Sequence, residues 1–132
     1  MTDSSTSPAL AAISPFFIVR DVSASLAFYR DLLGFEVAFL TPEDAPFFAI
    51  VRRDRAQLML KALGVQPLPN PKQHPLARWD AFIHAPDPDA VAAEFGARGV
   101  KLRAPLDDTE DHLRGFELED PDGYVLFFGR PV

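Results

Sequence analysis

The chain has 132 residues, of which 48% are hydrophobic and 24% charged, as expected for one soluble globular domain. The net charge is −6, and no cluster of Lys and Arg interleaves with aromatic residues, so no nucleic-acid partner is expected. The absence of cysteine excludes disulfides, thiolate nucleophiles and zinc–thiolate sites. Residues 1–12 lack the features of a signal peptide and no segment could span a membrane, so we expect a cytoplasmic protein without a membrane partner.

The first structured unit follows a Ser/Thr-rich segment, residues 1–11, which we expect to be a flexible tail. Residues 16–19 (FFIV) predict a short buried strand. The next residues predict a helix that Asp21 caps and Gly34 ends in a left-handed conformation. Apolar residues recur at helical spacing and give this helix one face for packing on a sheet: Val22, Leu26, Tyr29 and Leu33.

A second unit repeats this pattern about 65 residues later, which indicates two copies of one module. Asp87 stands where the first unit has Asp21, Pro88 occupies the first helical position, and Gly99 ends the helix. The spacing from Asp to Gly is one residue shorter than in the first unit. The two modules are expected to bury their faces against each other.

The remaining segments complete each module with three strands. In the first module the strands are predicted at 36–40, 47–52 and 56–60, and a proline-rich linker follows at 63–77. In the second module we predict strands at 78–85, 100–103, 114–119 and 124–129, a helix at 88–98 and a loop at 104–113. The sequence therefore predicts an α+β fold of two tandem βαβββ modules, 12–62 and 78–130, within one domain at 12–132.

Strand alternation sorts side chains into two faces without showing which one the helices cover. In the first strand Phe17 and Val19 share a face, opposite Ser14, Phe16 and Ile18. Both faces of most strands are apolar, so periodicity leaves the two assignments open.

Two runs, VRDVSASLAFYRDLLGF and GFELEDPDGYVLFF, resemble the two ends of the vicinal oxygen chelate superfamily. This superfamily includes glyoxalase I, extradiol dioxygenases, fosfomycin-resistance enzymes and bleomycin-resistance proteins. The likeness covers residues 13–130. It implies a curved mixed sheet around a cup, with the helices on the outer face, and a homodimer.

The resemblance also identifies the positions that hold a metal ion in the enzymes of this superfamily. Those ligands project from the first, fifth and last strands, and in some members from the fourth. The matching positions of this chain hold Ser14, Met59, Ala81 and Phe127. Because these side chains are poor ligands for a divalent cation, we expect neither a metal ion nor another cofactor.

In the same frame, the cup is lined by apolar and aromatic side chains and has an acidic rim in the loop 104–113. The predicted ligand-binding residues are Phe16, Ile18, Met59, Trp79, Ile83, Phe127, Asp107 and Asp108. Such a cup suits a flat, amphipathic small molecule, and the acidic balance of the chain favours a cationic one. The chain is most similar in type to metal-free bleomycin-resistance proteins, which implies capture of a ligand and antibiotic resistance.

Two alternatives remain open. One is a metal-dependent lyase or dioxygenase with relocated ligands drawn from His84, His112, Glu117 and Glu119; the other is a degenerate member whose cup is filled by its own side chains. His84 has the opposite parity to Ala81 and is predicted to be a packed core residue, whereas His74 and His112 are predicted to lie in loops. The chain contains no GxSxG, P-loop, GxGxxG or HExxH motif.

Overall fold

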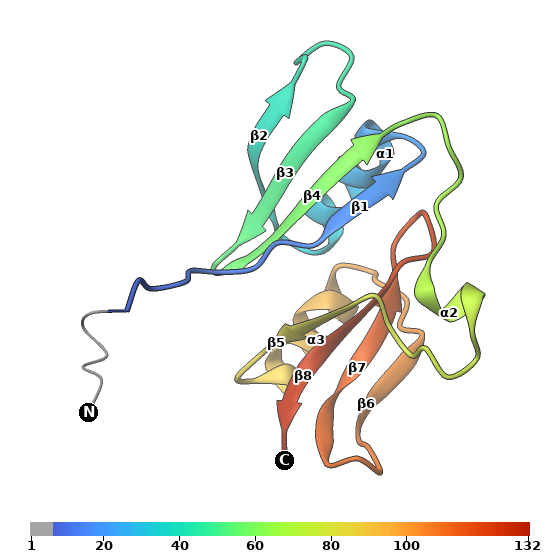
Figure 1. The fold of residues 1–132 in the computed structure, drawn as a ribbon. Coiled ribbons are helices and arrows are strands. Elements are labelled where there is room, and N and C mark those ends of the chain that lie inside the picture. Colours follow the sequence, from blue (N-terminus) through green and yellow to red (C-terminus); the bar gives the residue numbers. More distant parts are fainter. Residues whose placement is uncertain (1–6) are drawn as a thin grey trace.

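The computed structural model describes residues 7–132, so residues 1–6 of the predicted tail lie outside the described part of the chain. The chain forms two βαβββ modules joined by a linker (Figure 1). The first comprises β1 (Phe16–Val19), α1 (Val22–Leu26), η2 (Ala27–Leu32), β2 (Glu36–Thr41), β3 (Phe48–Arg53) and β4 (Ala56–Ala62). The second comprises β5 (Ala81–His84), α3 (Pro88–Ala97), β6 (Ala104–Asp108), β7 (Leu113–Glu119) and β8 (Val125–Pro131).

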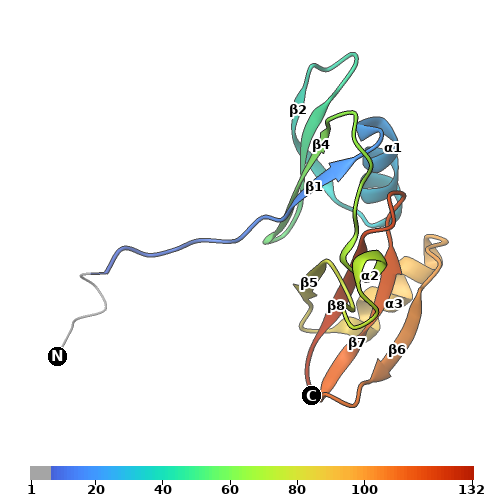
Figure 2. The same ribbon diagram turned by 45° about the vertical axis from the view of Figure 1, so that its right-hand side comes forward.

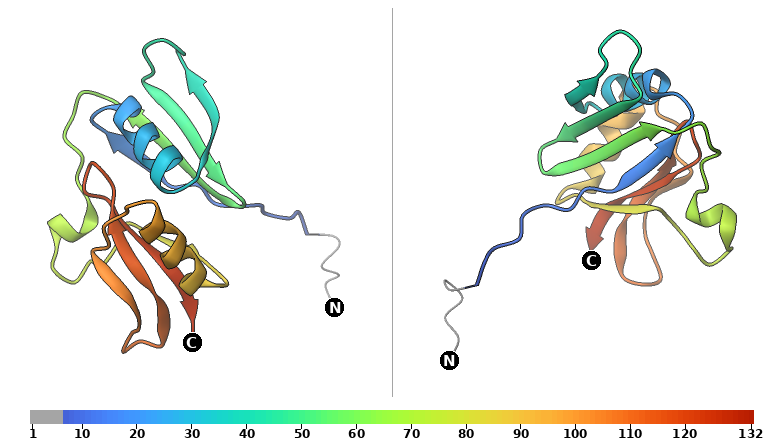
Figure 3. Two further views of the ribbon diagram at one scale, coloured as in Figure 1. Left: turned by 180° about the vertical axis from the view of Figure 1, so that it is seen from behind. Right: turned by 45° about the horizontal axis from the view of Figure 1, so that its top comes forward.

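Each module has its own four-stranded mixed sheet, in the order β1-β4-β3-β2 or β5-β8-β7-β6. In both sheets the first strand of the module pairs in parallel with the last. The predicted α+β class and the two tandem βαβββ modules are therefore confirmed. The helices α1 and α3 cover the same side of the molecule, which is seen from behind in Figure 3.

The linker leaves the end of β4 and descends along the second module, where it forms the short helix α2 (Asn70–Gln73; Figure 2). The Asp80 carboxylate fixes this helix by accepting a hydrogen bond from the Asn70 backbone N–H at 2.7 Å. In the described part of the chain, no helix has the length and apolar character needed to cross a membrane.

The two helices begin and end as the sequence predicts. Asp21 accepts a bond from the Ser23 N–H, Asp87 accepts one from the Ala90 N–H, and Gly34 and Gly99 have φ of 73° and 85°. The extra residue of the first helix is accommodated in the π-helical turn η2, where the Leu33 N–H bonds the Phe28 carbonyl. A single inserted residue produces such a turn because it widens one helical turn without moving the ends.

Burial settles which strand faces the helices cover. In the first module Phe17 and Val19 of β1 are 5% and 0% exposed, and Leu58 and Leu60 of β4 are equally buried. Their neighbours Phe16, Ile18 and Met59 therefore lie on the face that no helix covers, as the resemblance implied.

One prediction for the second module is wrong. The strand expected at 100–103 and the loop expected at 104–113 are replaced by β6 at Ala104–Asp108. Residues before it stay close to the helix end, because the Val100 N–H bonds the Phe95 carbonyl. Pro105 indicated a loop, but β6 pairs only with β7 and is an edge strand, where a residue without an N–H is tolerated.

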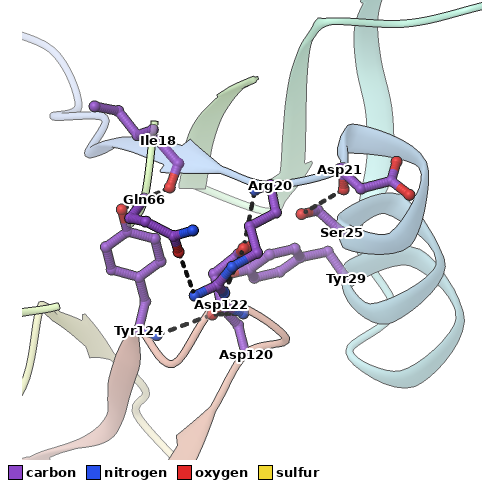
Figure 4. A network of polar contacts seen from close by, with 9 residues as sticks. All are labelled: Ile18, Arg20, Asp21, Ser25, Tyr29, Gln66, Asp120, Asp122 and Tyr124. Carbon is purple, nitrogen blue, oxygen red and sulfur yellow. Dashed lines mark hydrogen bonds and ion pairs between the residues drawn. The ribbon is translucent and has the colours of Figure 1, made fainter. Parts of the chain in front are cut away.

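The turn between β7 and β8 docks the second module onto the first (Figure 4). The Tyr29 hydroxyl on η2 donates a 2.7 Å hydrogen bond to Asp120 Oδ2, and both side chains are buried. Asp120 Oδ1 accepts the backbone N–H groups of Asp122 and Tyr124 at 2.9 Å each. One carboxylate thus shapes the turn and also binds the first module.

Three further contacts surround this bond. The Arg20 backbone N–H donates to Asp122 Oδ1 at 2.9 Å. The Tyr124 hydroxyl donates to the Ile18 carbonyl at 2.6 Å, and its ring stacks on Phe17 with centroids 4.2 Å apart. The polar groups of this turn therefore help to set the position of the second sheet beside the first.

A separate ion pair joins the helix side of the modules. Arg53 binds both carboxylate oxygens of Glu94 on α3, at 2.8 and 2.7 Å, and also donates to the Leu33 carbonyl. The bond from Arg53 is the main reason that the pKa of Glu94 is lowered. Arg98 donates to the Asp31 carbonyl, so two guanidinium groups satisfy carbonyls at the end of the first helix.

Burial of Asp120 gives the docking turn a pH dependence. Desolvation raises the pKa of Asp120 from 3.8 to about 6, and it also raises the pKa of Tyr29. Between pH 4 and 6 the folded protein binds more protons than the unfolded chain, so stability falls as pH rises. The loss over this window is about 3 kcal/mol, and the contribution is constant below it and above it.

We therefore predict that Asp120→Asn abolishes this component of the pH dependence. The free energy of unfolding, measured with urea from pH 4 to 7, should fall for the wild type relative to the variant by about 2 to 3 kcal/mol. Asp44→Asn, on the exposed turn after β2, is the control and should follow the wild type. If the free energies of unfolding of the wild type and Asp120→Asn differed by the same amount from pH 4 to 7, the prediction would be contradicted.

Candidate ligand-binding site

The helix-free face of the second sheet carries three aromatic rings in contact, here called the aromatic patch: Trp79, Phe82 and Phe127. Phe82 on β5 pairs with Phe127 on β8, so their side chains share a face. Their ring centroids are 4.9 Å apart, and the Trp79 ring lies 4.7 Å from Phe127 and 5.7 Å from Phe82. Offset and edge contacts of this kind stabilise aromatic clusters and leave a broad apolar surface.

Two glycines set the depth of the aromatic patch. Gly115 and Gly129 are paired across β7 and β8, and Phe127 lies over both of them. A Cβ atom at either glycine would be 2.5 Å from the Phe127 ring, so any larger residue would push the ring out of place. Phe127 is only 1% exposed and forms the floor of the patch; the resemblance assigned this position to a metal ligand.

Charged residues surround the aromatic patch. The Arg78 guanidinium carbon lies 4.4 Å over the Trp79 ring, and Arg78 Nη1 is 2.7 Å from Asp111 Oδ2. The Thr109 hydroxyl, and also Arg78, lower the pKa of the Asp111 carboxyl. Asp111, Thr109, Glu110 and Arg78 line a hollow of about 310 Å³ beside the patch.

The helix-free face of the first sheet is also apolar and more exposed. Phe16 pairs with Met59 and Met59 with Ile50, so these side chains share one face. Phe16 is 52% exposed. Ser14 lies near the edge of this face, where its hydroxyl accepts a hydrogen bond from the Gln57 amide at 3.0 Å. That Phe16, Ile18 and Met59 bind a ligand remains a prediction.

The predicted parity of β5 is wrong. Trp79, Ala81 and Ile83 were assigned to one face, but Ala81 and Ile83 pack against the core on the helix side. The physical reason is that the chain bends at Asp80, so strict alternation does not extend from Trp79 into β5. Ile83 instead lines a groove of about 1060 Å³ between the modules.

The two predicted rim residues lie on opposite faces of the second sheet. Asp107 pairs with Gly115 and shares the face of the aromatic patch. Asp108 pairs with Arg114, whose guanidinium bonds both Asp108 and Asp89 on α3, at 2.9 and 2.8 Å. Asp108 therefore belongs to an ion-pair cluster on the helix side, and its prediction as a rim residue is wrong.

The side chains proposed as relocated metal ligands are dispersed. Glu117 and Glu119 lie 3.5 and 3.6 Å from Arg103, and His112 occupies a turn with φ of 63°. His84 is exposed, in contact with Phe82 at 4.7 Å, rather than packed in the core as predicted. In residues 7–132 no three His, Asp or Glu side chains lie close enough together to hold a metal ion.

Three features of the site were missed from the sequence: Phe82, Arg78 and the paired glycines. The alternation of β5 contained the signal for Phe82, which shares the parity of His84. The glycines Gly115 and Gly129 stand inside predicted strands, where an isolated glycine indicates close approach of another group. The contact of Arg78 with Trp79 had no sequence signal.

The sequence pattern of the Glyoxalase/Bleomycin resistance protein/Dioxygenase superfamily matches residues 10–128. The chain therefore belongs to this superfamily, in agreement with the resemblance of its two end runs. A search of curated proteins finds no significant match.

Similar solved structures include three proteins whose names state that they bind a ligand. The bleomycin-binding protein from bleomycin-producing Streptomyces verticillus, complexed with copper(II)-bleomycin, is 26% identical with a TM-score of 0.67, covering 92% of this chain and 97% of its own. A bleomycin-binding protein complexed with bleomycin is 21% identical with a TM-score of 0.71. The likeness covers 93% of this chain and 100% of that protein. The antibiotic-binding protein TnmS3 from Streptomyces sp. CB03234 is 22% identical with a TM-score of 0.68, covering 96% and 100%. At 21% and 22% identity, the last two comparisons show only that this chain shares the fold of those proteins.

We predict that Phe127→Ala removes the floor of the aromatic patch. Loss of this buried ring should destabilise the protein by about 3 to 5 kcal/mol. Trp79 is the single tryptophan, so its emission should shift to longer wavelength as water reaches the indole ring. Phe39→Ala, at a half-exposed ring on β2, should change neither quantity much. An unchanged emission maximum in folded Phe127→Ala would contradict the described contact.

Proposed function

We propose that this chain is a small-molecule-binding protein of the bleomycin-resistance type, which captures an amphipathic cationic ligand without a metal ion. The observation that carries the proposal is the aromatic patch, which places three rings in tilted and edge contact on a helix-free sheet face with acidic side chains nearby. Aromatic faces attract both flat apolar groups and cations. Sequestration of a toxic compound would confer antibiotic resistance in the cytoplasm.

The chemistry of the metal positions supports capture over catalysis. Ser14 is bonded to Gln57, Ala81 packs in the core, and Phe127 is covered by Trp79. Met59 offers a thioether, which is a poor ligand for the divalent ions that favour nitrogen and oxygen. Among the relocated candidates, Glu117 and Glu119 are both engaged by Arg103.

We further propose that two copies of the chain complete the site. The helix-free face of the first sheet exposes large apolar side chains, with Phe16 and Phe39 about half exposed. An apolar area of this kind indicates an interaction surface. Light scattering should give a mass twice the 14.6 kDa of one chain, and a mass of one chain at all concentrations would exclude the homodimer.

Calorimetric titration with bleomycin and with other amphipathic cations tests the proposed function. Trp79→Ala should weaken binding about five- to thirtyfold, because a lost aromatic contact costs on the order of 1 to 2 kcal/mol. Trp79→Phe keeps an aromatic ring and should bind nearly as well as the wild type. Leu63→Ala, at an exposed linker position, is the control for an unrelated apolar truncation.

One outcome favours the second candidate function, a degenerate member with a filled cup. Phe127 already occupies the floor of the aromatic patch, so a protein that binds no compound of the panel would be explained by self-filling. Absence of any heat change with every ligand would therefore contradict the proposed capture.

A further inference from the structure

The Trp79 ring already has a cation bound to it. The Arg78 guanidinium carbon is 4.4 Å from the ring centre, well within the distance of a cation–π contact. Phe127 and Phe82 contact the same indole ring, at centroid distances of 4.7 and 5.7 Å. A planar cation thus occupies a ring position at which a flat ligand could stack.

Arg78 is held at this position by one acidic residue. Arg78 Nη1 is 2.7 Å from Asp111 Oδ2, and the Thr109 hydroxyl donates a hydrogen bond to the other oxygen of this carboxylate. The two side chains of the ion pair are 42% and 53% exposed. Exposed ion pairs and exposed cation–π contacts are both weak, so Arg78 can leave the ring at low cost.

The backbone beside Arg78 is fixed, in contrast to its side chain. The Arg103 guanidinium donates to the Arg78 carbonyl at 3.2 Å, and the Asp80 carboxylate accepts the Val125 N–H at 2.8 Å. The side chain of Arg78 can therefore swing away while Trp79 keeps its place on Phe127. Removal of the guanidinium would expose both a ring face and an anionic carboxylate.

We propose that Arg78 is an internal substitute for the ligand, and that a planar aromatic cation binds by displacing it. This inference rests on the proposed function and specifies its ligand class. The incoming cation stacks on Trp79 and forms an ion pair with Asp111. The Asp111 carboxylate thus exchanges its ion pair with Arg78 for one with the ligand. A neutral ring of the same shape can displace Arg78 but gains no counter-ion, and the wild type therefore prefers the cation.

The test uses the fluorescence of Trp79 and a planar cationic probe, proflavine, with acridone as the neutral counterpart. Arg78→Gln should bind proflavine roughly three- to tenfold more tightly than the wild type, since no internal group competes for the ring. Arg30→Gln, which changes the net charge equally on the exposed surface of η2, should leave the affinity unchanged.

A second substitution tests whether Asp111 forms an ion pair with the ligand. Adding Asp111→Asn to Arg78→Gln should weaken proflavine binding about threefold or more and leave acridone binding unchanged. Equal affinities of wild type and Arg78→Gln for proflavine, or an equal gain in Arg30→Gln, would overturn the inference while the proposed capture stands. Absence of quenching in the wild type and in every variant would overturn the inference. Bleomycin binding, measured separately, decides the proposed function.

Discussion

The buried hydrogen bond between Tyr29 and Asp120 is the contact on which the arrangement of this molecule depends. The buried residues of both modules form one core, and the turn that adds the polar contact to it is shaped by Asp120 itself. An unpaired carboxylate in this position would have to be neutralised or rehydrated, since burial already raises the pKa of Asp120 to about 6. The relative position of the two sheets is therefore coupled to this polar contact as well as to the apolar core that the modules share.

The repeat in the sequence was sufficient to predict the modules because it combines independent local signals. Asp caps, glycine stops and an apolar helical stripe agree at both places, and each has a short-range physical cause. The one-residue difference between the repeats corresponds to the π-helical turn η2, although its form was not predicted. The missed strand β6 has a different explanation: Pro105 is compatible with a strand only at an edge, and edge position is a property of the assembled sheet.

The candidate site was harder to predict because side-chain direction accumulates errors along a strand. Phe16, Ile18 and Met59 were placed on the correct face, since β1 and β4 are regular. Because the chain bends at Asp80, the predicted faces of β5 were interchanged. Phe82, and not the predicted Ile83, therefore lies beside Trp79. Asp107 and Asp108 then separated onto opposite faces because the loop was a strand. Contacts between distant segments, such as Arg78 with Asp111, leave no local trace in the sequence.

A site built from aromatic rings over paired glycines is suited to binding a ligand rather than to catalysing a reaction. Its proposed action needs no ion, because ring faces and nearby carboxylates supply the attraction to a flat cation. The most direct measurement is titration of metal-free bleomycin into protein stripped with a chelator, with elemental analysis of the same sample. The account predicts saturable binding with an affinity that the chelator does not change, and substoichiometric metal before stripping. An ion held at one per chain by protein nitrogen or oxygen atoms, together with loss of binding on its removal, would contradict it.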